Sequence, residues 1–120
     1  MIEGTTTLRI WNLTPHAIVY DDGLHRQEFP SDATVRLSQK ESTSEPIGFL
    51  QTVCTTYGPP EGLPEAIAAG DVLLVSSLVA EHWPEIHRLA DVIVLVPDTG
   101  PTCRRSSDGQ VSSVCRFIRK

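Results

Sequence analysis

Two short, unbroken apolar runs are the clearest feature of the hydrophobic pattern. Asp71–Val75 and Asp91–Val96 lack the alternation of a strand with one wet face, so they predict strands covered on both faces. Between them, Ser76-Ser77 offers an N-cap for a helix that begins near Leu78, and Pro84 is expected to interrupt that helix. Strand, helix and strand over this length predict a βαβ unit with parallel strands.

The pattern before these runs predicts several shorter strands. Leu8–Leu13 alternates apolar and polar residues, and Pro15 cannot continue its ladder. Ala17–Tyr20 predicts a second strand and Val35–Leu37 a third. Residues 1–7 are expected to form a flexible N-terminus.

The middle of the chain predicts a loop followed by a long strand. Residues 39–47 are polar and rich in turn formers, so we expect a flexible loop there. Phe49–Tyr57 is rich in aromatic and β-branched residues, which favour strands. The aromatic side chains of Trp11, Phe49 and Trp83 are expected in the core.

The tail of the chain predicts a β-hairpin. Thr102–Ser106 and Val111–Ile118 flank Asp108-Gly109, and Asp-Gly between such arms is a strong hairpin signal. Together these elements predict one small α/β domain over residues 1–120. Its mixed sheet would contain one βαβ unit and carry antiparallel hairpins at its edges.

Composition narrows the classes of partner. The chain has 120 residues, of which 40% are hydrophobic, enough for one core. Its 10 Lys and Arg against 15 Asp and Glu give a formal charge of −5, which argues against a surface for duplex nucleic acid. No run approaches the roughly 18 apolar residues of a membrane span, and the first residues do not resemble a signal peptide. We therefore expect a cytoplasmic protein without a membrane partner; a homo-oligomer is compatible with the sequence.

The predicted topology suggests one binding site. If the Leu8–Leu13 strand runs parallel to the two apolar strands, the loops that follow all three meet at one sheet edge, where ligands bind in open α/β sheets. Ser76 and Ser77 would also lie at a helix N-terminus, which favours anions, and the basic pair in the tail could neutralise phosphate. The candidate ligand-binding residues are Asn12, Thr14, His16, Ser76, Ser77, Asp98, Thr99, Arg104 and Arg105.

Each candidate also has a plainer interpretation. Ser76 or Ser77 could serve only as a helix cap, and Asn12 and Thr14 could satisfy the backbone of a turn. His16 could bond a nearby carbonyl, and the arginine pair could be a solvated hairpin face.

The usual dinucleotide, nucleotide-triphosphate and serine-hydrolase motifs are missing from the sequence. There is no Gly-x-Gly-x-x-Gly, P-loop or Gly-x-Ser-x-Gly, so no cofactor is expected. Cys54, Cys103 and Cys115 have no zinc-type spacing, and His82 and His87 are not an i, i+4 pair, so no metal is expected either. We expect the three cysteines to be reduced thiols.

The segment Asn12-Leu13-Thr14-Pro15-His16-Ala17-Ile18 resembles the opening of a set of small proteins encoded by bacteria and their phages. Tyr57-Gly58 with Leu63-Pro64, the segment Val75–Val79 and the hairpin turn Asp108–Val111 extend the resemblance over most of the chain. It implies an accessory protein of a mobile element. Small α/β proteins in that setting often handle or sequester nucleotide signals, which is an argument by analogy.

These observations lead to one main functional expectation. The chain is expected to bind a small phosphate-bearing molecule, such as a nucleotide. The alternative is a phosphodiesterase or related hydrolase that works without metal, with His16 as its acid or base. A protein-interaction module without a pocket is the third interpretation.

Overall fold

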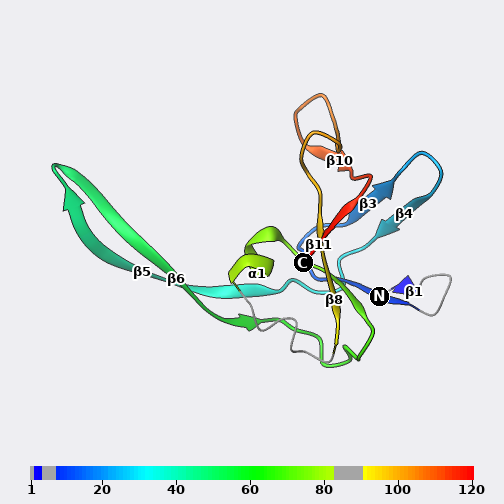
Figure 1. Ribbon diagram of the computed structural model, residues 1–120, viewed down its shortest axis with the longest axis horizontal. Coiled ribbons are helices and arrows are strands. Elements are labelled where there is room, and N and C mark those ends of the chain that lie inside the picture. Colours follow the sequence, from blue (N-terminus) through cyan, green and yellow to red (C-terminus); the bar gives the residue numbers. More distant parts are fainter. Residues whose placement is uncertain (1, 4–7, 83–90) are drawn as a thin grey trace.

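A five-stranded mixed sheet forms the centre of the protein (Figure 1). The computed structural model describes residues 2–3, 8–82 and 91–120. Strands β2, β7 and β8 run parallel to one another, while β1 and β11 pair antiparallel at the two edges. In spatial order the strands are β1 (Ile2–Glu3), β2 (Arg9–Asn12), β7 (Val72–Leu74), β8 (Ile93–Pro97) and β11 (Phe117–Arg119).

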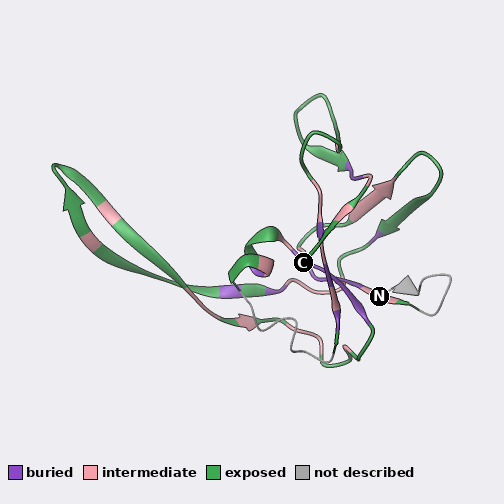
Figure 2. Cartoon of the chain, viewed as in Figure 1, coloured by how far each residue is buried: buried purple, intermediate pink, exposed green. Residues whose placement is uncertain are grey.

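Both faces of this sheet are covered. Neighbouring residues of its central strands point to opposite sides, and each side belongs to a core cluster. Leu73 and Val94 pack on one face in the larger core cluster, which also includes residues at the start of β5 and in the helix. Leu74 lies on the other face with Phe29. Burial is accordingly densest along β7 and β8 (Figure 2). The two apolar runs are therefore buried parallel neighbours, as their pattern predicts.

Three antiparallel hairpins and one short helix complete the described chain. The hairpins are β3 (Ile18–Asp21) with β4 (Arg26–Phe29), β5 (Arg36–Ile47) with β6 (Leu50–Glu61), and β9 (Arg104–Arg105) with β10 (Val111–Ser113). Helix α1 (Ser77–His82) follows β7, close to its predicted start. No helix in the described ranges is long and apolar enough to cross a membrane.

The expectation of an α/β fold is only partly met. The mixed sheet, the parallel pair and the antiparallel hairpins are present, but the described helix has only six residues and strands dominate. The predicted break at Pro84, the rest of that helix and Trp83 lie outside the described residues. Of residues 1–7, Ile2 and Glu3 form β1, and the others are likewise outside the described ranges.

The structure corrects two predictions in the middle of the chain. Residues 39–47 lie in strand β5 rather than in a loop, and the following strand runs on to Glu61. Phe49, expected in the core, is 92% exposed at the end of this hairpin, whereas Trp11 is buried as expected. The hairpin extends away from the sheet (Figure 1), and the radius of gyration is 16.9 Å. A compact chain of this length would have about 14 Å.

Leu74 supplies a direct test of the core. It is 1% exposed, so Leu74→Ala should lower the free energy of unfolding by about 2–5 kcal/mol through lost burial and the resulting cavity. The measurement is urea unfolding. Leu24→Ala is the matched control, because Leu24 is 88% exposed and its truncation should change stability by less than about 0.5 kcal/mol. Equal losses in the two variants would contradict the assigned core.

Candidate functional site

A cleft lies at the carboxyl ends of the three parallel strands. Since β2, β7 and β8 share one direction, the segments that follow them reach the same edge of the sheet. The cleft has a volume of about 760 Å³, within the range of small-molecule sites. Its walls come from residues 14 and 16–19 after β2, 76–77 after β7, 96–100 around the end of β8, 105 and 110–114 in the β9–β10 hairpin, and Ile118.

Seven of the nine predicted ligand-binding residues line this cleft. They are Thr14, His16, Ser76, Ser77, Asp98, Thr99 and Arg105. The other two, Asn12 and Arg104, do not line it. Asn12 is fully buried, and Arg104 is exposed on β9.

Asn12 is a structural residue whose amide is occupied within the protein. Its Nδ2 donates to the carbonyl oxygens of His16 (2.9 Å) and Phe29 (2.8 Å). Its Oδ1 accepts from the Thr14 N–H (3.0 Å) and the Thr14 hydroxyl (2.6 Å). Its backbone N–H donates to an Asp32 carboxylate oxygen at 2.8 Å. Asn12 therefore positions the loop that carries Thr14 and His16, in line with its plainer interpretation.

The two serines at the cleft have different roles. The Ser76 hydroxyl accepts from the Val79 N–H at 3.3 Å, so Ser76 caps α1. Ser77 is exposed and its hydroxyl has no partner among the described residues. The Ser77 hydroxyl is therefore free to meet a ligand in the cleft, and the Ser76 hydroxyl, although it accepts from Val79, still has its O–H to donate.

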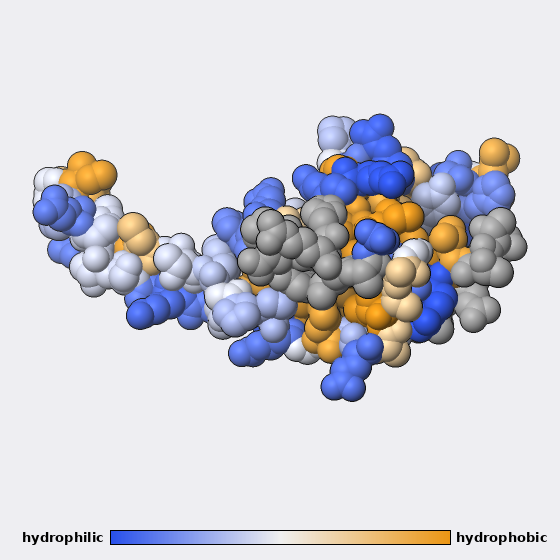
Figure 3. Space-filling model, turned by 60° about the horizontal axis from the view of Figure 1, so that its bottom comes forward, coloured by the Kyte–Doolittle hydropathy of each residue, from blue (hydrophilic) through white to orange (hydrophobic). Residues whose placement is uncertain are grey.

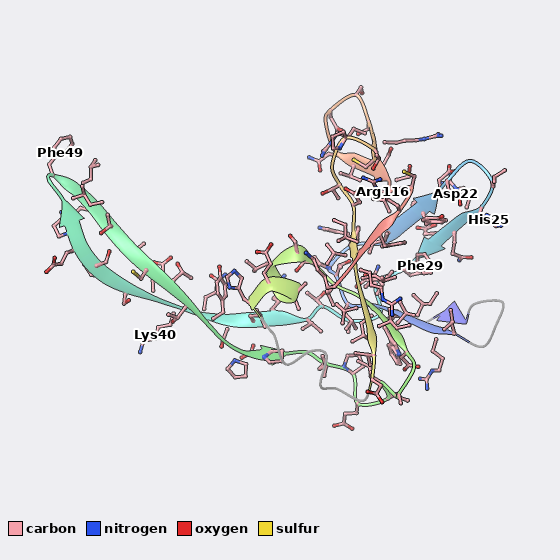
Figure 4. All side chains as sticks on the ribbon, in the orientation of Figure 1. Asp22, His25, Phe29, Lys40, Phe49 and Arg116 are labelled. Carbon is pink, nitrogen blue, oxygen red and sulfur yellow. The ribbon has the colours of Figure 1, made fainter. Side chains whose placement is uncertain are left out.

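Asp98 forms an ion pair with Arg116 beside the cleft. Arg116 Nε donates to Asp98 Oδ2 at 2.5 Å, and the Gly100 N–H donates to Asp98 Oδ1 at 3.0 Å. The Arg116 hydrogen bond is the main reason that the pKa of the Asp98 carboxyl lies below its ordinary value, with the Gly100 bond adding to it. Arg116 is labelled in Figure 4. Nothing in the sequence pairs Arg116 with Asp98, and Arg116 was not among the predicted site residues.

Arg105 brings a positive charge to the cleft that no described carboxylate pairs with. Its two terminal nitrogens donate to the carbonyl oxygens of Gly109 and Thr99, both at 2.9 Å. These bonds hold the guanidinium between the hairpin and the loop after β8. Since the Asp98–Arg116 pair is neutral as a unit, Arg105 gives the site its net positive character, which favours an anion.

The wall made by the hairpin was missed by sequence reasoning. The Val114 N–H donates to the Val19 carbonyl (2.9 Å), and the Asp21 N–H donates to the Val114 carbonyl (2.8 Å). This pairing holds the end of β10 against β3 and brings residues 110–114 to the cleft. The Asp-Gly turn predicts the hairpin but carries no information about where the hairpin docks.

The side chains that line the cleft are better placed to bind a ligand than to catalyse a reaction. His16 is exposed in its wall, and its imidazole has no hydrogen-bond partner among the described residues. Within the described part of the chain, no residue that lines the cleft pairs a nucleophile with a base, the usual sign of covalent catalysis. Nor does that part bring together three His, Cys, Asp or Glu side chains able to hold a metal ion.

No known protein family, curated protein or solved structure matches this chain. The resemblance of residues 12–18 to phage-encoded proteins therefore stays an expectation.

Asn12→Asp tests the role of the buried amide with almost no change in volume. The variant removes both Nδ2 donors, leaving the carbonyls of His16 and Phe29 without them. We expect the free energy of unfolding to fall by about 1–3 kcal/mol, the cost of one buried unsatisfied group, because the Phe29 carbonyl loses its donor whereas the His16 carbonyl keeps the Thr14 hydroxyl. Denaturant unfolding measures the loss, and Gln27→Glu is the control because Gln27 is exposed on β4. A loss below about 1 kcal/mol for Asn12→Asp would show that the amide does not organise the loop.

The Asp98–Arg116 pair predicts a pH dependence of stability. Because the folded-state pKa of Asp98 is lowered, the unfolded chain takes up a proton first as the pH falls. The stabilisation is therefore complete above the ordinary aspartate value of about 3.9 and is lost as the pH falls through the lowered pKa. Asp98→Asn should be less stable than the wild type at pH 6, and the difference should narrow below about pH 4.

Denaturant unfolding between pH 2.5 and 6 measures this difference. Glu65→Gln is the control, since Glu65 is exposed and has no partner among the described residues. A difference between Asp98→Asn and the wild type that stays constant with pH would rule out the ion pair as a stabilising interaction.

Proposed function

We propose that this protein binds a small phosphate-bearing molecule, specifically a nucleotide, in the cleft at the carboxyl ends of β2, β7 and β8. One observation carries the proposal: the loops after β2 and β7 and the β9–β10 hairpin bring His16, Ser77 and Arg105 to one cleft of about 760 Å³. A guanidinium matches phosphate oxygens with two parallel hydrogen bonds, and a hydroxyl supplies a further donor.

The proposed roles follow from which groups remain available. Arg105 takes the phosphate through the N–H groups that its bonds to Gly109 and Thr99 leave free, since a guanidinium has five. Ser77 lies beside it, and the His16 ring supplies a further N–H donor. Asp98 is held ionised by Arg116 and has lone pairs left to accept from a ribose hydroxyl. Asn12 is not a ligand contact here, and the N-terminus of the six-residue α1 is not needed.

The nature of the ligand rests on the resemblance as well as on the cleft. The opening Asn-Leu-Thr-Pro-His motif suggests an accessory protein of phage or mobile-element type. The proposal therefore extends to a nucleotide signal that is held rather than consumed. Hydrolysis at the same site, with His16 as acid or base, is the alternative, favoured by the exposed imidazole in the cleft wall.

A nucleotide panel tests the proposal. Purified protein is titrated calorimetrically with inorganic phosphate, nucleoside monophosphates, cyclic dinucleotides and the parent nucleosides, and each nucleotide is recovered and analysed by chromatography. We expect saturable binding that requires the phosphate, with the nucleotide recovered unchanged. Recovery of a cleaved product would favour the hydrolase, and no binding across the panel would contradict both.

Variants of the cleft locate the binding. Arg105→Gln should weaken binding about 10- to 100-fold, the value of a charge-assisted hydrogen bond, and Arg105→Lys should restore part of it. Arg119→Gln is the matched control, since Arg119 is exposed on β11 and does not line the cleft. Thermal melts of each variant check that the loop held by Arg105 stays folded. Equal affinities for Arg105→Gln and the wild type would place the ligand elsewhere.

A further inference from the structure

Cys103 and Cys115 lie close together where the β9–β10 hairpin begins and ends. The Cys115 thiol donates to the carbonyl oxygen of Thr102, with sulfur and oxygen 3.4 Å apart. In a trans peptide, a carbonyl oxygen and the Cα of the next residue are about 2.8 Å apart, so the Cys115 sulfur lies within about 6 Å of the Cys103 Cα. The Cys115 thiol is therefore already directed at the segment that carries Cys103.

The pairing of the two strands agrees with this contact. Arg104 pairs with Ser113 in the β9–β10 ladder, so Cys103 stands one residue before the pair and Cys115 two residues after it. Paired residues of antiparallel strands have Cα atoms about 4.5–5.5 Å apart, and a disulfide needs Cα atoms about 4.4–6.8 Å apart. At this position in the hairpin, side-chain rotation with a small backbone movement can join the two sulfurs.

Both cysteines are reduced and partly exposed, so a small molecule can reach them. Cys54 is exposed on β6, in the hairpin that projects away from the rest of the protein in both views (Figure 1 and Figure 3). Among the three cysteines, the fold thus brings Cys103 and Cys115 together and holds Cys54 apart. Disulfides that form in the cytoplasm, the expected location, are usually transient and redox-sensing, so a reversible bond is the kind that suits this pair.

We propose that Cys103 and Cys115 form a reversible disulfide whose oxidant is a small disulfide such as glutathione disulfide. One cysteine thiolate attacks a sulfur of the oxidant, which forms a mixed disulfide and releases one glutathione thiolate. The second cysteine thiolate attacks the protein sulfur of the mixed disulfide and releases the other glutathione. The two protein thiols lose two electrons and two protons, and one glutathione disulfide becomes two thiols.

The bond fixes the wall of the cleft that carries Arg105. It closes a loop over residues 103–115, which contains every hairpin residue that lines the cleft. Without the bond, strand β9 has only two residues and its ladder with β10 is irregular. The other end of the loop is anchored, because Val114 exchanges backbone hydrogen bonds with β3. Joining Cys103 to Cys115 therefore ties the segment after β8 to an anchored strand.

The disulfide is inferred from the hairpin alone, whereas its effect on ligand affinity rests on the proposed function. A side chain that is already held in place loses less conformational freedom when it binds, which improves affinity. With Arg105 on a cross-linked hairpin, the oxidised protein should bind a nucleotide about 3- to 10-fold more tightly than the reduced protein. The pair thereby makes binding in the cleft sensitive to redox conditions.

Equilibration in glutathione buffers of increasing oxidised fraction tests the disulfide. Free thiols are then alkylated, and the digested protein is mapped by mass spectrometry. We expect an intramolecular bond between Cys103 and Cys115 that dithiothreitol reverses. Cys103→Ser and Cys115→Ser should each prevent it, whereas Cys54→Ser, the matched control, should leave it unchanged; circular dichroism verifies folding. A chain that gives only free thiols, glutathione adducts or Cys54-linked dimers in glutathione disulfide alone would overturn the proposal.

Hydrogen exchange and titration with a nucleoside monophosphate, both on the Cys54→Ser chain, test the effect on the cleft. Oxidation should slow exchange of the amides of residues 104–114 at least ten-fold and tighten nucleotide binding. Cys54→Ser/Cys115→Ser should respond in neither measurement. Slower exchange with no binding in either state would support the disulfide and contradict only the proposed function. Exchange rates and affinities that are equal in the two states would overturn the regulatory role.

Discussion

The buried amide of Asn12 is the constraint on which the arrangement of the site depends. It lies at the end of β2. Its Nδ2 donates to the carbonyl of His16 in the following loop and to that of Phe29 at the end of β4, and its Oδ1 accepts from Thr14 in the same loop. Its backbone carbonyl also accepts from the N–H of Asp32 at 2.9 Å. One side chain with 0% exposure thus ties the loop after β2 to the end of β4, and the Asn12 backbone adds the contacts to Asp32. A buried amide with all its partners in place permits a single geometry of the loop, because any shift leaves polar atoms unsatisfied.

That geometry matters because of the direction of the strands. The parallel β2, β7 and β8 deliver three loops to one edge, and the Asn12 bonds determine how the first of them is presented. Arg105 connects the remaining two parts of the site, since it bonds both the loop after β8 and the turn of the β9–β10 hairpin. The cleft is therefore held by polar contacts around a rigid sheet edge, an arrangement suited to binding an anion with hydroxyl and guanidinium donors.

The sequence predicts well those strands whose residues are buried in the core. The runs around Leu74 and Val94 are apolar without interruption because both faces of the sheet are covered, and their parallel pairing follows from the helix-bearing connection. Six of the seven predicted site residues in the cleft follow these parallel strands, whereas Arg105 comes with the β9–β10 hairpin. Residues 39–47 of β5 escaped prediction, since these polar residues carry no alternation for a strand that faces water on both sides, whereas most of β6 was predicted from Phe49–Tyr57. Contacts such as Asp98 with Arg116 depend on tertiary docking, which no local pattern encodes.

The central claim is that a phosphate-bearing ligand occupies the cleft beside Arg105. The most direct measurement is a titration of the ¹⁵N-labelled protein with a nucleoside monophosphate, followed by the chemical shifts of its backbone amides. We expect saturable shifts confined to amides around His16, Ser77, Thr99 and Arg105, with the resonances of the β5–β6 hairpin unmoved. Shifts centred on that hairpin, or an unchanged spectrum at millimolar ligand, would contradict the claim.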